Sequence, residues 1–85
     1  MMNYDAMVSR LNSLGYRKST GVSHTDDGMT IIDFQKGRKG MQMFSAYLNQ
    51  DGSVQYLEKT KLQWNEVQGR YVPRVERIYG LSQLV

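Results

Sequence analysis

Apolar and polar residues alternate through the middle of the chain, over residues 29–62. Ile32 and Phe34 are separated by one polar residue, Asp33. Phe44, Ala46 and Leu48 occupy every second position in the same way later in the chain. Successive side chains of a strand point to opposite faces of a sheet, so this period predicts strands with one face toward a core. In these runs the even-numbered residues are expected to face that core.

Glycines divide the same stretch at equal intervals, at Gly28, Gly40 and Gly52. Each closes a polar cluster, and two of the three clusters end in Asp-Gly. The Asp-Gly pair is one of the strongest local signals for a hairpin turn. The spacing therefore predicts an antiparallel meander, in which consecutive strands are joined by short turns.

The first residues have a different period, because apolar side chains recur every three or four positions. This spacing predicts a helix over Tyr4–Leu14 with one apolar face. Asn3 precedes it as a candidate N-cap, and Gly15 follows it at the position where helices commonly end. The residues of the apolar face are Tyr4, Met7, Val8, Leu11 and Leu14.

Two further segments extend the predicted sheet with weaker signals. Residues 16–24 contain β-branched residues but also Gly21 and several hydroxyl groups, which favours a poorly buried edge strand. Pro73 excludes a central strand position for residues 71–79, so this segment is predicted to be an edge strand. A short helix that begins at Pro73 and ends at Gly80 is the alternative.

Residues 41–50 also admit a second interpretation. Met, Gln, Ala and Leu are good helix formers, and Met41, Phe44 and Leu48 fit one helical face. The flanking turn signals favour a strand. The predicted fold is α+β, a single domain over residues 1–85 with an N-terminal helix packed on a four- or five-stranded antiparallel β-meander.

Composition excludes several classes of site. The 85 residues contain no cysteine, so disulfides and thiolate metal sites are ruled out and a cytoplasmic protein is expected. Nowhere is there an apolar run long enough for a signal peptide or a membrane span. His24 is the only histidine, and no pair of carboxylates is singled out by spacing. We expect no enzymatic activity, no cofactor and no metal.

The odd-numbered face of the meander is neither clearly polar nor clearly a core. A sheet covered by one helix should be polar on its other face, so large apolar groups there call for a cover. Three outcomes remain open: the C-terminal segment folds over this face, a second copy or another protein covers it, or it is exposed. The candidate interaction residues are Ile31, Met41, Met43, Tyr47 and Leu57.

Basic residues suggest a different kind of partner. The net charge is +3, and the cations gather at a predicted hairpin tip and in a C-terminal row. Exposed tyrosines among Tyr47, Tyr56, Tyr71 and Tyr79 would add stacking surfaces for bases. The candidate nucleic-acid-binding residues are Lys36, Arg38, Lys39, Arg70, Arg74 and Arg77.

The sequence therefore predicts a small non-enzymatic interaction module that binds a protein partner or itself through a sheet face or edge. Proteins of this size without a catalytic set are common among accessory and inhibitor proteins, including those of phages and mobile elements. Nucleic-acid binding through the basic tip and the arginine row is the alternative function.

Overall fold

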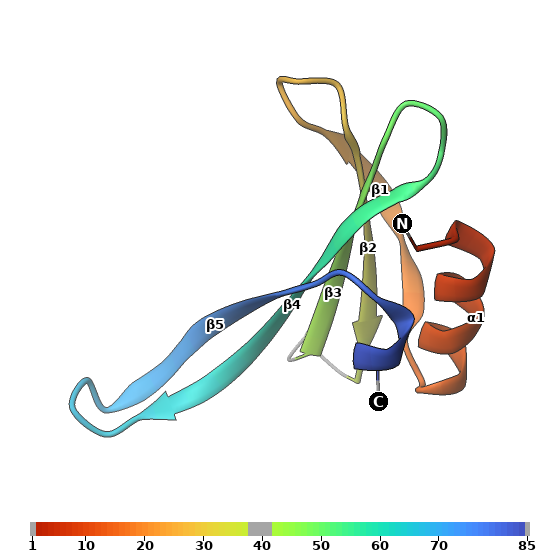
Figure 1. Cartoon of the computed structure of the whole chain (residues 1–85). Coiled ribbons are helices and arrows are strands. Elements are labelled where there is room, and N and C mark those ends of the chain that lie inside the picture. The colour runs from red at the N-terminus through yellow and green to blue at the C-terminus, as the bar shows by residue number, and fades with distance from the viewer. Residues whose placement is uncertain (1, 38–41, 85) are drawn as a thin grey trace.

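The structure is a computed structural model that describes residues 2–37 and 42–84. One helix is followed by five strands and a short 3₁₀ helix (Figure 1). The elements are α1 (Tyr4–Ser13), β1 (Arg17–His24), β2 (Thr30–Lys36), β3 (Gln42–Leu48), β4 (Val54–Asn65), β5 (Arg70–Ile78) and η2 (Leu81–Gln83).

The five strands form one antiparallel sheet in the order in which they occur in the chain. This arrangement confirms the predicted α+β fold with a helix and a meander. Residues 42–48 form the central strand β3, and the helix considered for this segment does not form. The segment forms a strand because β3 is hydrogen-bonded to a neighbouring strand on each side, β2 on one and β4 on the other.

Both ends of α1 agree with the sequence signals. The side chain of Asn3 accepts a hydrogen bond from the Ala6 N–H at 3.0 Å, which satisfies one of the free donors of the first turn. Gly15 follows the helix with a φ of +96°, a conformation that favours glycine. Met7 and Leu11 are fully buried, so the apolar face of α1 covers the sheet.

The core lies between α1 and one face of the sheet. Ile32 pairs with Ala46 and Phe34 pairs with Phe44, which places all four side chains on this face. We call it the helix-side face, and the opposite side of the sheet the open face. The buried cluster consists of Met2, Met7, Leu11, Tyr16, Ile32, Phe34, Phe44, Ala46, Leu48, Val54, Leu57, Ile78 and Leu84.

The hairpin of β4 and β5 extends well beyond the other strands. β4 has 12 residues whereas β3 has 7, and Lys61 is the last residue of β4 that pairs with β3, through Gln42. Beyond that residue, β4 and β5 pair only with each other, and Figure 1 shows this part as an arm that leads away from α1. Pro73 lies within the edge strand β5, so the alternative helix at this position does not form.

Tyr16, which directly precedes β1, is buried in the core. Its ring packs edge-on against Phe44, with 4.8 Å between the centroids, and its hydroxyl donates to Oε1 of Gln42 at 3.1 Å. Burial raises the pKa of Tyr16 above its ordinary value of 10.0. The stabilisation that follows from this shift is complete below about pH 10 and is lost as the pH rises toward the folded-state pKa.

We expect Tyr16→Phe to lower the free energy of unfolding at neutral pH by about 1 kcal/mol, because a hydrogen bond is lost. Above about pH 10 the stability of the variant should fall less steeply than that of the wild type. Urea unfolding at a series of pH values measures both effects. An equally steep fall of the unfolding free energy above about pH 10 in both proteins would show that Tyr16 does not cause this pH dependence.

Candidate functional site

The open face carries a mixed set of side chains arranged in rows across the sheet. One row joins Ile31, Tyr47 and Tyr56, because these residues are ladder partners on β2, β3 and β4. A second row is polar and contains Asp33, Ser45, Glu58 and Arg77. A third contains Met43, Thr60 and Val75.

The placement of Leu57 differs from the prediction. Leu57 pairs with Ala46 on the helix-side face and is fully buried in the core. The cause is a bulge in β4: Tyr47 pairs with Tyr56 and Leu48 pairs with Val54, so Gln55 is an extra residue. An extra residue exchanges the faces of all residues that follow it, so Leu57 is removed from the predicted interaction surface.

The same bulge places other side chains on the open face. Tyr56 and Leu62 were expected to face the core with the even-numbered residues, but their partners Tyr47 and Pro73 show that they face away from it. Trp64 and Tyr71 follow on the arm as a further pair on this side. Sequence periodicity assigned Tyr56 and Leu62 to the wrong face because the alternation of apolar and polar residues did not reveal the bulge at Gln55.

The C-terminal segment does not cover the open face. Leu84 is buried in the same cluster as Met7 and Leu11, and its carbonyl accepts a hydrogen bond from a guanidinium nitrogen of Arg10 at 3.5 Å. The segment therefore packs at the helix-side face, next to α1 (Figure 1). The outcome in which the chain's own tail covers the mixed face is thereby excluded.

Three tyrosines form a group on the open face, at the end where β3 finishes and β4 begins. The rings of Tyr47 and Tyr56 are stacked, with 4.7 Å between centroids and 21° between planes. Tyr79 continues this group, with its centroid 6.1 Å from that of Tyr56. Tyr47 and Tyr56 are only partly buried, and Tyr79 is 59% exposed. The group is therefore a preformed aromatic surface that remains in contact with solvent.

A charged pair borders the tyrosines. The Arg77 guanidinium lies 4.5 Å from the centroid of the Tyr56 ring, and its Nε is 3.9 Å from Oε1 of Glu58. Partial burial, followed by the negative charge of Glu58, raises the pKa of Tyr47. Tyr47 is therefore a neutral hydroxyl donor at physiological pH, and this part of the face contains both charges and apolar rings.

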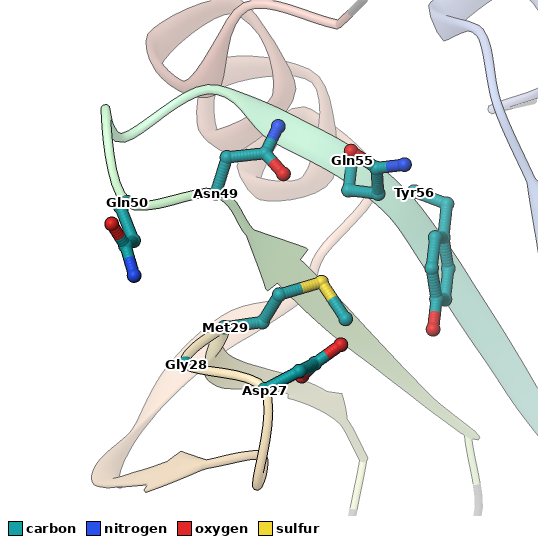
Figure 2. Close-up of a pocket in the computed structure, with 7 residues that line it drawn as sticks. All are labelled: Asp27, Gly28, Met29, Asn49, Gln50, Gln55 and Tyr56. Carbon is teal, nitrogen blue, oxygen red and sulfur yellow. The ribbon is translucent and has the colours of Figure 1, made fainter.

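A hollow of about 340 Å³ opens beside Tyr56, between the loops that precede β2 and β4. In Figure 2, Asp27 and Met29 approach it from the first loop, while Asn49 and Gln50 belong to the second. Three of its seven lining residues carry amide side chains, and none is a histidine. The hollow thus offers hydrogen-bonding groups at one end of the aromatic surface but no acid-base pair.

The basic residues divide between the two faces. Arg70 and Arg74 lie on the helix-side face of the arm, opposite Asn65 and Lys61, whereas Arg77 is on the open face. Lys36 is on the helix-side face at the end of β2, two residues beyond Phe34. The row expected from the sequence therefore does not form one surface. Arg38, Lys39 and Met41 lie outside the described residues.

The carboxylates and His24 do not assemble into a metal site. Within residues 2–37 and 42–84, no three His, Cys, Asp or Glu residues are close enough to hold a metal ion. His24 is exposed on the edge strand β1, where its Nδ1 lies 3.4 Å from the Thr30 hydroxyl. No helix in the described part of the chain has the length and apolar character needed to cross a membrane.

Comparisons with protein-family models, with curated proteins and with solved structures find no match to the chain.

Proposed function

We propose that the protein is a non-enzymatic interaction module whose binding surface is the open face, and that the partner it accommodates is a second copy of the chain. The observation that carries this proposal is the uncovered aromatic surface around Tyr56, given that the C-terminal segment packs on the other side. Exposed apolar surface of this kind typically marks a site of association.

The arm extends this surface along the same face. The rings of Trp64 and Tyr71 pack edge-on, with 5.2 Å between their centroids and 72° between their planes, and both are more than half exposed. Val75 and Tyr79 are exposed to a similar degree, by 55% and 59%. Tyrosine and tryptophan are enriched at the centres of protein interfaces. Such a distribution supports binding of a protein surface over the whole length of β4 and β5.

The charge pattern supports a second copy as the partner. The polar row reads Asp33, Ser45, Glu58, Arg77 from β2 to β5. Two open faces can meet about a two-fold axis that runs parallel to the strands, between β3 and β4. Each row of one copy then lies opposite the same row of the second copy, with the order of its residues reversed. Asp33 then faces Arg77 of the second copy, and Ser45 faces Glu58. Such an interface is isologous, as closed dimers require.

The neighbouring row remains apolar under the same operation. Ile31 faces Tyr79 of the second copy, and Tyr47 faces Tyr56, so aromatic rings meet on both sides of the axis. Two sheets that pack face to face lie about 10 Å apart, which large side chains such as these fill. The open face is therefore complementary to itself both in charge and in apolar character.

Association through a sheet edge is less favoured by the structure. The free edge at β5 contains Pro73, which has no N–H to donate to an added strand. At the other edge, the pairing of β1 with β2 is irregular between Lys18 and Val22. Both edges thus carry features that oppose the addition of a strand.

A charge exchange tests the proposed dimer. Arg77→Asp and Asp33→Arg should each weaken self-association, because each places like charges opposite one another, and the double variant should restore it. Within one chain the two residues are three strands apart, about 14 Å, so a direct contact between them requires a second copy. Sedimentation equilibrium measures the dissociation constant of each variant.

The loss of self-association in each single variant is informative only if that variant remains folded, and circular dichroism verifies this. A wild-type protein that stays monomeric over the accessible concentration range would overturn self-association. A double variant weaker than both single variants would exclude this two-fold arrangement.

A further inference from the structure

The two faces of the β4–β5 arm differ in chemistry. Aromatic and apolar side chains lie on the open face, where Leu62 is opposite Pro73 and Trp64 is opposite Tyr71. The helix-side face carries cations instead. It presents Lys59, Lys61, Arg70 and Arg74, and Lys36 adds a fifth cation beside the base of the arm.

The cations at the base of the arm follow one line across the sheet. Lys36 pairs with Gln42, Gln42 pairs with Lys61, and Lys61 pairs with Arg74. Neighbouring strands are about 4.8 Å apart, so this line spans about 14 Å between the backbones of Lys36 and Arg74. Lys59 lies on the same face one step toward the core, with its ammonium 5.9 Å from the centroid of the Phe44 ring.

These charges are not neutralised within the described part of the chain. The one ion pair found there within 4.0 Å joins Arg77 to Glu58 on the open face. Glu76, the ladder partner of Lys59, is the single carboxylate among the described residues on the helix-side face of the arm. The five cations therefore outnumber the acidic groups around them.

Acidic residues gather at the other end of the molecule. Asp26, Asp27 and Asp51 lie in the loops that precede β2 and β4. Figure 1 shows these two loops at the end of the sheet opposite the arm. Three of the eight acidic residues thus lie at the end away from the arm, whereas Glu58, Glu66 and Glu76 lie on the β4–β5 hairpin itself. Of these three, Glu76 shares the helix-side face with the cations, so the net charge of +3 understates the positive potential on that face.

We infer that the helix-side face of the β4–β5 arm is a binding site for the phosphate backbone of double-stranded DNA. A two-stranded antiparallel ribbon has dimensions that the major groove of B-form DNA admits. The deep, narrow major groove of an RNA duplex does not admit one. Backbone contacts of this kind position a protein on DNA without reading its sequence.

The separation of the two faces argues against a single strand as the ligand. Proteins that bind single strands combine cations with aromatic rings on which bases stack. Here Trp64 and Tyr71 project from the opposite side of the arm to Lys61 and Arg74. The rings next to Lys59 and Lys36 are those of Phe44 and Tyr16, which are buried in the core. Among the described residues, a strand held by these cations thus has no exposed ring beside them on which its bases can stack. The site is distinct from the open face and does not depend on self-association.

The salt dependence of binding tests this inference. A labelled duplex of about 20 base pairs is titrated by fluorescence anisotropy between about 50 and about 200 mM NaCl. With five phosphate contacts, the affinity should fall about 500-fold over this range, since log K changes with log salt by about −0.9 per contact. The double variant Lys61→Gln, Arg74→Gln should bind more weakly and lose only about 40-fold.

A control variant, Arg10→Gln with Arg17→Gln, has the same net charge as the Lys61→Gln, Arg74→Gln variant and leaves the arm intact. It should retain the wild-type affinity and salt dependence. Lys61 and Arg74 are both exposed, so their replacement should leave folding and self-association unchanged, as circular dichroism and sedimentation verify.

Several outcomes would overturn the inference. They are an absence of duplex binding at the lowest salt, equal loss of affinity in the control variant, and unchanged binding after Lys61 and Arg74 are replaced. Tighter binding of a single strand, of an RNA duplex or of polyglutamate than of the DNA duplex would also contradict it. Failure of self-association leaves this result unaffected, so the two proposals are separable.

Discussion

Leu57→Ala should lower the free energy of unfolding by about 3 kcal/mol, one of the largest effects of any single truncation in the sheet. Leu57 is fully buried on the helix-side face, opposite Ala46 and Ile78. Its removal leaves a cavity in the buried core that the surrounding side chains fill only in part. A domain of this size has a total stability of about 5 to 15 kcal/mol, so the loss is a large fraction.

The matched control is Leu62→Ala, on the same strand but on the open face. Leu62 is partly exposed, so its truncation should cost about 1 kcal/mol or less. Urea denaturation of both variants measures the difference. A greater loss for Leu62→Ala than for Leu57→Ala would show that the bulge at Gln55 does not exchange the two faces as described.

Leu84→Ala should destabilise the protein by about 2 to 4 kcal/mol, although the residue is next to the C-terminus. Leu84 is 1% exposed and belongs to the cluster that contains Met7 and Leu11. Its truncation removes the contact between the C-terminal segment and α1, so the helix should lose protection at the same time. Denaturant unfolding and amide hydrogen exchange in α1 measure the two effects.

Ser82→Ala is the control, because Ser82 is exposed in the same segment. It should change the stability by no more than about 0.5 kcal/mol. Self-association should be equal in both variants once each is folded, since the segment does not cover the open face. Wild-type stability in Leu84→Ala would contradict the position of the tail.

The elements with strong local signals could be predicted from the sequence. The helix was predicted over residues 4–14 from its apolar spacing and the Asn3 cap, and it is observed over Tyr4–Ser13. Hairpins of the meander were predicted from Asp-Gly pairs, and Gly28 and Gly52 of these pairs have positive φ in the structure. The ambiguity at residues 41–50 is resolved by pairing on both sides of β3, a tertiary contact that local propensity does not include.

The candidate site could be predicted only in part. Ile31, Met43 and Tyr47 lie on the expected face because β2 and β3 pair without interruption from Thr30 to Lys36. Leu57 does not, because one extra residue in β4 exchanges the faces that follow it. The arginine row is divided for a related reason: Arg74 and Arg77 are an odd number of positions apart, so they project to opposite sides of β5.

The sequence by itself determined the α+β architecture, the order of its strands and the absence of cysteine chemistry, since these depend on local period, turn residues and composition. Only the tertiary structure decided which face remains open, because that depends on the bulge at Gln55 and on the side where Leu84 packs. The bulge depends on how β3 and β4 pair, and the position of Leu84 depends on contacts with α1, at the other end of the chain. The pairing of β4 with β5 places the aromatic side chains of the arm on the open face and its cations Lys61 and Arg74 on the helix-side face.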